Sequence, residues 1–241
     1  MMNLIIDEGN TRIKAAIFSK EKLLETLTCT SSDYEELILL TEKYHPYKCL
    51  ISSTKSNLSD FADYSESFSQ FIFLDHTIKT PLNNLYETPE TLGKDRLAGA
   101  VGGYHFYAGS TILVIDAGTA LTFDYVDKDG NYLGGTISPG LNIRLKALNA
   151  FTSKLPLVEP EFSENILGKN THEAIQQGVF NGITHEINGV CSGFLDNNPH
   201  GKVILTGGDA VFFEKYVKST IFVIPNLVLI GLNTILEHNA N

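Results

Sequence analysis

The sequence predicts an α/β fold built from two similar lobes, on two observations. First, an apolar run that leads into Asp-x-Gly occurs twice, within residues 4–18 and again within residues 113–126. Second, the segments after each copy alternate between strand-like and helix-like patterns. This alternation predicts helices packed on a sheet, and the repetition predicts that the unit is duplicated. We expect the lobes to span residues 1–108 and 109–241, with the boundary near Ala108-Gly109.

The first lobe is expected to open with a β-hairpin. Apolar and β-branched stretches flank Asp7-Glu8-Gly9-Asn10-Thr11, and Asp, Gly and Asn favour tight turns. The other elements predicted for this lobe are a helix from about Ser32, a helix that starts at Gly93, and strands over residues 22–28, 49–52 and 71–74.

The second lobe repeats the hairpin around Asp116-Ala117-Gly118-Thr119-Ala120. A long helix is predicted from Asn170, because Asn170 and Glu173 fit an N-cap arrangement and apolar or small residues follow at helical spacing. The other elements predicted here are strands over residues 132–137 and 203–206, a helix over residues 141–150, and two short helical segments at the end.

Composition limits the functions that the chain can have. A formal net charge of -10 opposes binding to nucleic acid and to anionic membrane surfaces. No apolar run approaches the ~20 residues of a membrane-spanning helix, and the first apolar run is too short for a signal sequence. The three cysteines form no Cys-x-x-Cys pair, and the seven histidines form no zinc-binding pattern. We therefore expect a cytoplasmic protein with no nucleic-acid or membrane partner.

The two hairpin turns carry the residue types that phosphate binding needs. Glycine lets main-chain N–H groups approach a phosphate, and Asn10, Thr11 and Lys14 can add donors to the first turn. Asp7, at the end of a buried strand, is poor core material but a good ligand for Mg²⁺ or its waters. Each turn alone is equally explained as an ordinary hairpin turn. The repetition favours two turns that face each other across a cleft and hold nucleotide phosphates.

Three further segments combine glycine with polar residues. In Gly93-Lys94-Asp95-Arg96, the acid and the arginine lie at a predicted helix N-terminus, where an anion is favoured and Asp95 could take a proton from a hydroxyl group. A helix-capping acid beside a surface arginine explains the same residues. The glycine-rich segments Gly134–Gly140 and Thr206–Ala210 predict close approach of the main chain to a ligand, and a structural loop explains each equally well.

Together these segments resemble the type III pantothenate kinases, a family of the actin-like ATPase superfamily, which includes the acetate and sugar kinases. The resemblance covers residues 4 to about 232 and rests on DEGNTRIK, Tyr-x-x-Pro-x-x-Leu-Gly-Lys-Asp-Arg, DAGTALTFD, GGTISPG and TGGDA. It implies two ribonuclease H-like lobes with a cleft between them. It also implies ATP-dependent phosphorylation of pantothenate to 4′-phosphopantothenate, the first step of coenzyme A biosynthesis.

The resemblance also implies roles for individual residues. Asp95 would be the general base, Asp116 would bind a monovalent cation (K⁺ or NH4⁺), and Asp7 would bind Mg²⁺, directly or through water. The residues implied to bind ATP and its phosphates are Asp7, Glu8, Gly9, Asn10, Thr11, Arg12, Ile13, Lys14 and Thr119. The residues implied to bind pantothenate are Tyr86, Gly93, Lys94, Asp95, Arg96 and Thr171.

Two further expectations concern assembly and a departure from the family. Family members are typically homodimers with the site near the subunit interface. The Gly178/Gly182 face of the predicted long helix suits close helix packing there, although packing within one chain explains it too. Glu8 stands where the family more often has a small or aliphatic residue. A second carboxylate beside Asp7 would either alter metal binding or face solvent.

Other functions fit parts of the sequence. A related kinase for a sugar or a carboxylate would keep both phosphate turns, but the GKDR motif and Tyr86 argue against it. A non-catalytic nucleotide-binding regulator, such as one that affects transcription, would not need the acids Asp7, Asp95 and Asp116. A protein-binding scaffold would need none of these acids in turns.

Overall fold

The computed structural model describes residues 1–9, 12–30, 34–53, 65–161 and 166–240. Their contacts divide the chain into two compact units. The first unit contains Met1–Gly109, Asp129–Leu133 and Asn226–Asn241, and the second contains Ser110–Lys128 and Gly134–Pro225. The division therefore differs from the single boundary that the sequence predicts, because two later segments return to the first unit.

The first unit is built on a five-stranded mixed sheet. In space the strands follow the order β3-β2-β1-β4-β5, in which β1 and β2 form the predicted antiparallel hairpin and β4 runs parallel to β1. Strand β3 continues the antiparallel meander, and β5 lies parallel to β4. The bounds are β1 (Met2–Glu8), β2 (Arg12–Ser19), β3 (Lys22–Thr30), β4 (Lys48–Ser53) and β5 (Gln70–Phe73).

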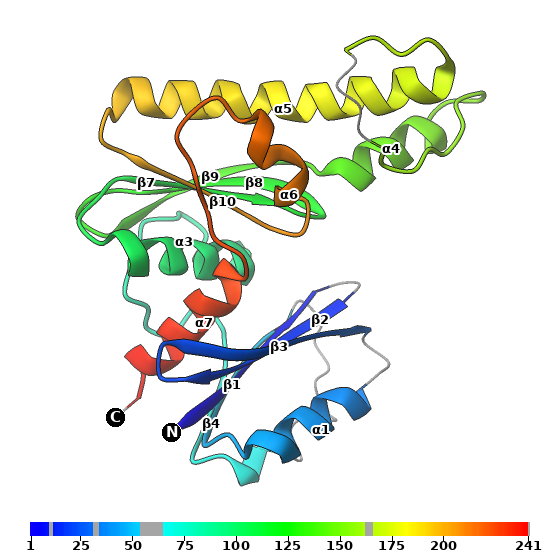
Figure 1. Ribbon diagram of the computed structural model, residues 1–241. Coiled ribbons are helices and arrows are strands. Elements are labelled where there is room, and N and C mark those ends of the chain that lie inside the picture. The colour runs from blue at the N-terminus through cyan, green and yellow to red at the C-terminus, as the bar shows by residue number, and fades with distance from the viewer. Residues whose placement is uncertain (10–11, 31–33, 54–64, 162–165, 241) are drawn as a thin grey trace. The chain divides into compact units, whose positions relative to one another are not determined.

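Helices cover both faces of this sheet (Figure 1). Alternate residues of β1, such as Leu4 and Ile6, pack with Leu37 and Leu40 of α1 (Tyr34–Tyr44). The opposite face packs against α7 (Leu227–His238), which in turn lies along α3 (Lys94–Tyr107). The short elements of this unit are η1 (Ser65–Ser67), β6 (Asn83–Asn84) and η2 (Pro89–Thr91).

Two glycines explain why α7 joins the first unit. A Cβ atom on Gly231 would lie 1.8 Å from the carbonyl oxygen of Ala98, and one on Gly102 would lie 2.6 Å from that of Leu227. The backbones of α3 and α7 therefore approach more closely than any side chain would allow. The sequence analysis assigns this helix to the second lobe by its position along the chain, whereas its contacts group it with the first unit.

The second unit repeats the strand order of the first. Its sheet has the order β11-β10-β7-β8-β9, and the two-residue β6 pairs with the start of β9 as a sixth strand. When β7 to β11 are counted along the chain and read from β9 to β11, both sheets place their third, second, first, fourth and fifth strands side by side in that order. Strands β7 and β8 form the second predicted antiparallel hairpin, and β10 and β11 run parallel to β7. The bounds are β7 (Ile112–Ala117), β8 (Ala120–Val126), β9 (Asn131–Pro139), β10 (Lys202–Thr206) and β11 (Phe222–Val223).

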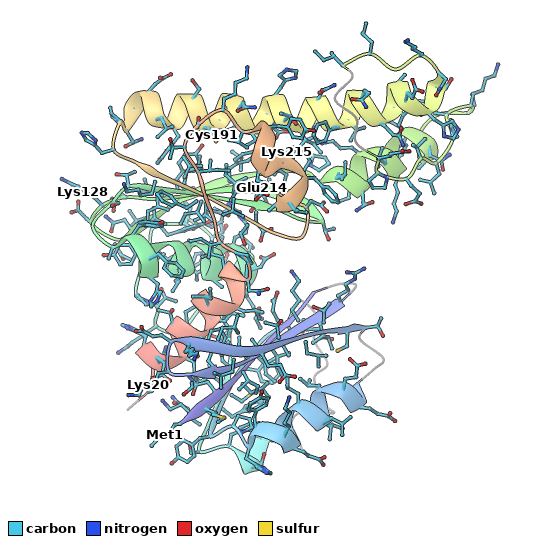
Figure 2. All side chains as sticks on the ribbon, in the orientation of Figure 1. Met1, Lys20, Lys128, Cys191, Glu214 and Lys215 are labelled. Atoms are coloured by element: carbon cyan, nitrogen blue, oxygen red, sulfur yellow. The ribbon has the colours of Figure 1, made fainter. Side chains whose placement is uncertain are left out.

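The long helix α5 (Thr171–Asn197) covers one face of this second sheet (Figure 1). The side chain of Asn170 accepts a hydrogen bond from the N–H of Glu173 at 3.0 Å, which confirms the predicted cap. Residues such as Ile183, Ile187 and Cys191 face the core; Cys191 is labelled in Figure 2, as are Glu214 and Lys215 of η3. The remaining helices are α4 (Leu141–Ala150), α6 (Ala210–Phe213) and η3 (Glu214–Tyr216). None of the helices described is both long and apolar enough to cross a membrane.

Candidate active site

The first predicted phosphate turn joins β1 to β2. Asp7 lies near the end of β1, directly opposite Lys14 of β2 in the antiparallel register. The N–H of Gly9 donates to the carbonyl oxygen of Arg12 at 3.0 Å and closes the turn. Asn10 and Thr11, which the sequence also assigns to phosphate binding, lie outside the described residues. An acid and a lysine therefore flank the start of this turn.

Glu8 and Ile13 lie on the other face of the sheet from Asp7. Successive side chains of a strand point to opposite faces, and Glu8 is buried with 1% of its surface exposed. Its carboxylate accepts a hydrogen bond from Ser53 Oγ at 2.7 Å. The expectation that Glu8 faces solvent is therefore wrong, and it is not a second carboxylate beside Asp7. Ile13 belongs to the core beneath the hairpin, so only its main chain is available to a ligand.

The environment of Asp7 disfavours its charge. Burial, followed by the charge of Asp95, raises the pKa of Asp7 to about 6, while a hydrogen bond from Ser52 and the charge of Lys14 act in the opposite direction. Ser52 is the parallel partner of Asp7 on β4. The first turn and the Gly93-Lys94-Asp95-Arg96 segment, which are far apart in the sequence, therefore meet in the first unit.

Asp95 lies in the first turn of α3, as the sequence predicts. Gly93 is the N-cap residue, and a Cβ atom there would come within 2.6 Å of Asp95 Oδ1. The same oxygen accepts a hydrogen bond from the N–H of Arg96 at 2.9 Å, and the Asp95 side chain is exposed. Lys94 donates to the carbonyl oxygen of Ser53 at 3.0 Å and ties the helix start to β4. The Asp95 carboxylate is thus fixed in direction and open to a substrate.

Arg96 and Tyr86 lie together. The guanidinium carbon of Arg96 is 5.8 Å from the centre of the Tyr86 ring, a cation–π distance, and Arg96 is 6% exposed. The Tyr86 ring in turn lies 6.3 Å from that of Tyr132. A buried cation on an aromatic ring suits recognition of a carboxylate, because guanidinium groups bind carboxylates through two parallel hydrogen bonds.

In the second unit, the turn after β7 packs against the segment Thr206–Ala210. Gly207 has a positive φ of 98°, and a Cβ atom there would lie 2.4 Å from Asp116 Oδ1 and 2.3 Å from the carbonyl oxygen of Ala117. The N–H of Asp209 donates to the same carbonyl oxygen at 2.8 Å. Glycine is therefore required at residue 207, both by the backbone conformation and by the nearness of Asp116.

The segment Gly134–Gly140 reaches the same turn from the other side. Gly140 donates its N–H to the carbonyl oxygen of Thr119 at 3.2 Å. A Cβ atom on Gly140 would lie 2.1 Å from the carbonyl oxygen of Gly118 and 2.5 Å from that of Thr119. Thr119 itself is exposed. Three of the five segments singled out in the sequence thus meet in the second unit, around Asp116, Gly118 and Thr119.

Thr171 is the first residue of α5 and is exposed. It is one of the residues that line a groove of about 940 Å³ between α4 and α5, whose apolar lining includes Leu148, Phe151 and Ile175. Thr171, Asp116 and Thr119 thus belong to the second unit, and Asp7, Tyr86, Asp95 and Arg96 belong to the first.

Two residues near these turns escaped the sequence analysis. Ser52 hydrogen-bonds Asp7, and Arg144 of α4 bonds to residues 138 and 139. Ser52 lies near the carboxyl end of β4, which runs parallel to β1. Ligands bind at the carboxyl ends of parallel strands, so this position could have marked Ser52 as a candidate site residue. A lone arginine in a helix gives no comparable signal.

The expected cations suit the donors present. No group of three or more His, Cys, Asp or Glu side chains is placed to hold a metal within the described ranges. The paired charges of Asp7 and Asp95, which raise the pKa of Asp7, are nevertheless the kind of field that a cation relieves. Asp116, beside the carbonyl oxygen of Ala117, supplies the oxygen donors that hard cations prefer.

Comparison with solved structures defines the class of fold. A Campylobacter jejuni protein described as a Baf family transcriptional activator matches with a TM-score of 0.61 at 22% identity, covering 98% of each chain. The ROK hexokinase of Thermus thermophilus matches with a TM-score of 0.52 at 14% identity over 100% of both chains. At these identities the likeness concerns the fold. The chain has the duplicated α/β fold of the actin-like ATPases and ROK kinases.

The particular family follows from sequence comparison. The model of the type III pantothenate kinase family matches residues 3–193. A type III pantothenate kinase of Bacteroides fragilis strain YCH46 is 43% identical over 239 residues, which cover 99% of this chain and 98% of that protein. The chain belongs to the type III pantothenate kinase family.

Proposed function

We propose that this chain transfers the γ-phosphoryl group of ATP to the terminal hydroxyl of pantothenate, giving 4′-phosphopantothenate for coenzyme A biosynthesis. Family membership over nearly the whole chain supports the reaction. The single observation that supports it most within the molecule is the start of α3. There the charge of the exposed Asp95 raises the pKa of Asp7, and the guanidinium group of Arg96 lies over the Tyr86 ring.

Asp95 is the general base of this proposal. Its carboxylate takes the proton of the pantothenate hydroxyl while the oxygen attacks the γ-phosphorus and the bond to the β-phosphate oxygen breaks. The hydrogen bond from the N–H of Arg96 fixes the direction of one carboxylate oxygen. The exposed position of Asp95 leaves the other oxygen accessible to the hydroxyl group.

Arg96 and Tyr86 recognise the pantothenate carboxylate. Arg96 is buried and rests on the Tyr86 ring, so its side chain loses little further freedom when an anion binds. Lys94 and Gly93 shape the same helix start, and Thr171 is also proposed to bind pantothenate. This division of roles predicts that changes to Tyr86 or Arg96 affect the KM for pantothenate more than the KM for ATP.

The two turns hold the nucleotide. In the first unit, Gly9 and Lys14 contact phosphates, and Asp7 holds Mg²⁺ directly or through water. In the second unit, Thr119 contacts ATP, and Asp116 with the carbonyl oxygen of Ala117 holds a monovalent cation, K⁺ or NH4⁺. When bound, these cations offset the negative charge that phosphoryl transfer concentrates on the phosphate oxygens.

The enzyme is also proposed to be a homodimer that works in the cytoplasm. Gly178 and Gly182 leave part of α5 without bulky side chains, and Phe151 nearby is 89% exposed, so an apolar face is available for a second copy. Cysteines buried as thiols, as Cys29, Cys49 and Cys191 are, suit a reducing compartment. Sedimentation analysis of the purified chain tests the dimer.

A coupled ADP-release assay with pantothenate, ATP and Mg²⁺ tests the reaction, run once with K⁺ and once with only Na⁺. Turnover that requires both pantothenate and K⁺ is expected. Pantothenate-dependent turnover in both salts would support the kinase reaction but contradict the assignment of a K⁺ site to Asp116. No turnover from folded protein at millimolar ATP would overturn the substrate, and a panel of sugars and carboxylates in the same assay would then identify a related kinase.

A further inference from the structure

Arg144 links the long helix α5 to the second phosphate turn. Its Nε donates to the carbonyl oxygen of Pro139 at 2.7 Å, and its Nη2 donates to Ser138 Oγ at 2.8 Å. The same Nη2 pairs with the carboxylate of Glu186 on α5. One side chain, mostly shielded from solvent, therefore holds two consecutive residues of the Gly134–Gly140 segment and one residue of α5.

The residues that Arg144 holds lead directly into the phosphate turn. Gly140 follows Pro139 and contacts the carbonyl oxygens of Gly118 and Thr119 so closely that no side chain fits at residue 140. Its N–H also donates to the carbonyl oxygen of Thr119. A shift of residues 138–140 therefore cannot occur without a shift of residues 118 and 119.

The other end of this series of contacts is rigid. Glu186 lies between Ile183 and Ile187, which are both buried in the core of the second unit. Helix α5 cannot move against its sheet without breaking that core. The contacts thus run from a fixed helix through Arg144 and residues 138–140 to the turn that carries Thr119.

We propose that Arg144, anchored by Glu186, is a positioning residue that sets the place of the Gly118-Thr119 turn for the nucleotide. This inference rests on the proposed function, because it assigns that turn to ATP. Arg144 acts through residues 138–140 and holds no catalytic role. Its loss should therefore weaken nucleotide binding much more than pantothenate binding, because every residue proposed to bind pantothenate except Thr171 lies in the first unit.

The test compares Arg144→Met, which keeps an unbranched apolar stem and removes the guanidinium donors, with Lys146→Met on the exposed side of the same helix. The KM values for ATP and pantothenate are measured by the activity assay. The Kd for ADP is measured by calorimetry in the presence of Mg²⁺. R144M should raise the KM for ATP and the Kd for ADP about tenfold, since misplaced contacts cost binding steeply, and should leave the KM for pantothenate within about twofold. K146M should match the wild type.

Two more variants separate positioning from general damage. Arg144→Lys keeps the charge but cannot reach three acceptors at once, so it should restore only part of the ADP affinity. Glu186→Gln should weaken ADP binding in the wild type and add nothing to R144M, because Glu186 acts through Arg144. ADP binding by R144M equal to that of the wild type, or equal losses for both substrates, would overturn the proposal.

The assay keeps the two proposals distinguishable. If the wild type binds ADP but does not phosphorylate pantothenate, the proposed function fails, and the Kd values for ADP still decide the role of Arg144. If R144M does not fold, R144K and Ser138→Ala decide it by the same comparison. If both S138A and R144K then bind ADP with the Kd of the wild type, the positioning role of Arg144 is contradicted.

Discussion

Asp7 and Asp95, which stand in separate motifs, lie close enough in the first unit for the charge of Asp95 to raise the pKa of Asp7. Burial makes the larger contribution, and the pKa of Asp7 reaches about 6. A site that holds two carboxylates in this way has an electrostatic cost when it is empty, and that cost is recovered when a cation or a proton binds.

Replacing Asp7 by Asn should stabilise the protein at pH 8 and abolish activity. The folded pKa of about 6 lies above the ordinary value of 3.8, so the ionised group opposes folding above pH 6. This cost shrinks as the pH falls from 6 to 3.8, because the folded state binds the proton first. From the size of the shift, discounted for partial exposure, D7N should gain about 2 kcal/mol at pH 8.

Urea unfolding in EDTA at pH 8 and at pH 4 measures this gain. Asp196→Asn, on the exposed side of α5, is the matched control and should change stability little at either pH. A D7N variant that is less stable than the wild type at pH 8 would contradict the unfavourable charge.

Replacing Asp95 by Asn should leave the fold intact and reduce kcat by about 10²-fold or more, as expected for loss of a general base. The side chain is exposed and its Oδ1 bond to the N–H of Arg96 is retained by the amide oxygen, so unfolding by urea should change little. A second readout follows the pKa of Asp7 by NMR. The pKa of Asp7 should fall because the charge of Asp95 is gone, but it should stay above 3.8 because burial is the larger cause of the raised pKa. An unchanged kcat would remove Asp95 from the role of base.

Replacing Tyr86 by Leu should raise the KM for pantothenate about tenfold with little effect on the KM for ATP. The change removes the ring on which the Arg96 guanidinium rests, a cation–π contact of about 1–2 kcal/mol when shielded from water. Tyr86→Phe keeps the ring and is the control. Equal KM values for pantothenate in Y86L and Y86F would show that the ring does not position Arg96.

Replacing Gly140 by Ala should both destabilise the second unit and weaken ATP binding. The new Cβ atom would lie 2.1 Å from the carbonyl oxygen of Gly118, so the turn must move, at a cost of about 1–3 kcal/mol. Gly189→Ala is the control, because nothing lies within 4 Å of a Cβ atom there and it is helical. G189A should gain up to about 1 kcal/mol in thermal unfolding. Destabilisation of G189A equal to that of G140A would point to a general intolerance of added side chains.

The sequence predicts the local elements well, because their causes are local. Both hairpins form where Asp-x-Gly interrupts apolar strands, and α5 begins at its Asn170 cap. The duplication is confirmed by the strand order shared by the two sheets. The start of α3 directly after its N-cap Gly93 is also predicted to within one residue.

The features that the sequence does not predict depend on contacts between distant residues. Helix α7 joins the first unit because Gly231 and Gly102 admit a close backbone contact, and a glycine in a helix does not indicate its partner. The burial of Glu8 depends on Ser53 of β4. The role of Arg144 depends on Glu186 of α5. The roles of individual site residues stay predictions that the variants above address.

The return of α7 to the first unit has a consequence for protein synthesis. One face of β1 and β4 packs against α7, so these two strands lack the helix that covers this face until residues 227–238 have been translated. The second unit, whose segments end at Pro225, can complete its core before then. The first unit therefore completes its core only after the segments of the second unit have been synthesised, and an apolar sheet face without its helix is the kind of surface through which partly folded chains aggregate.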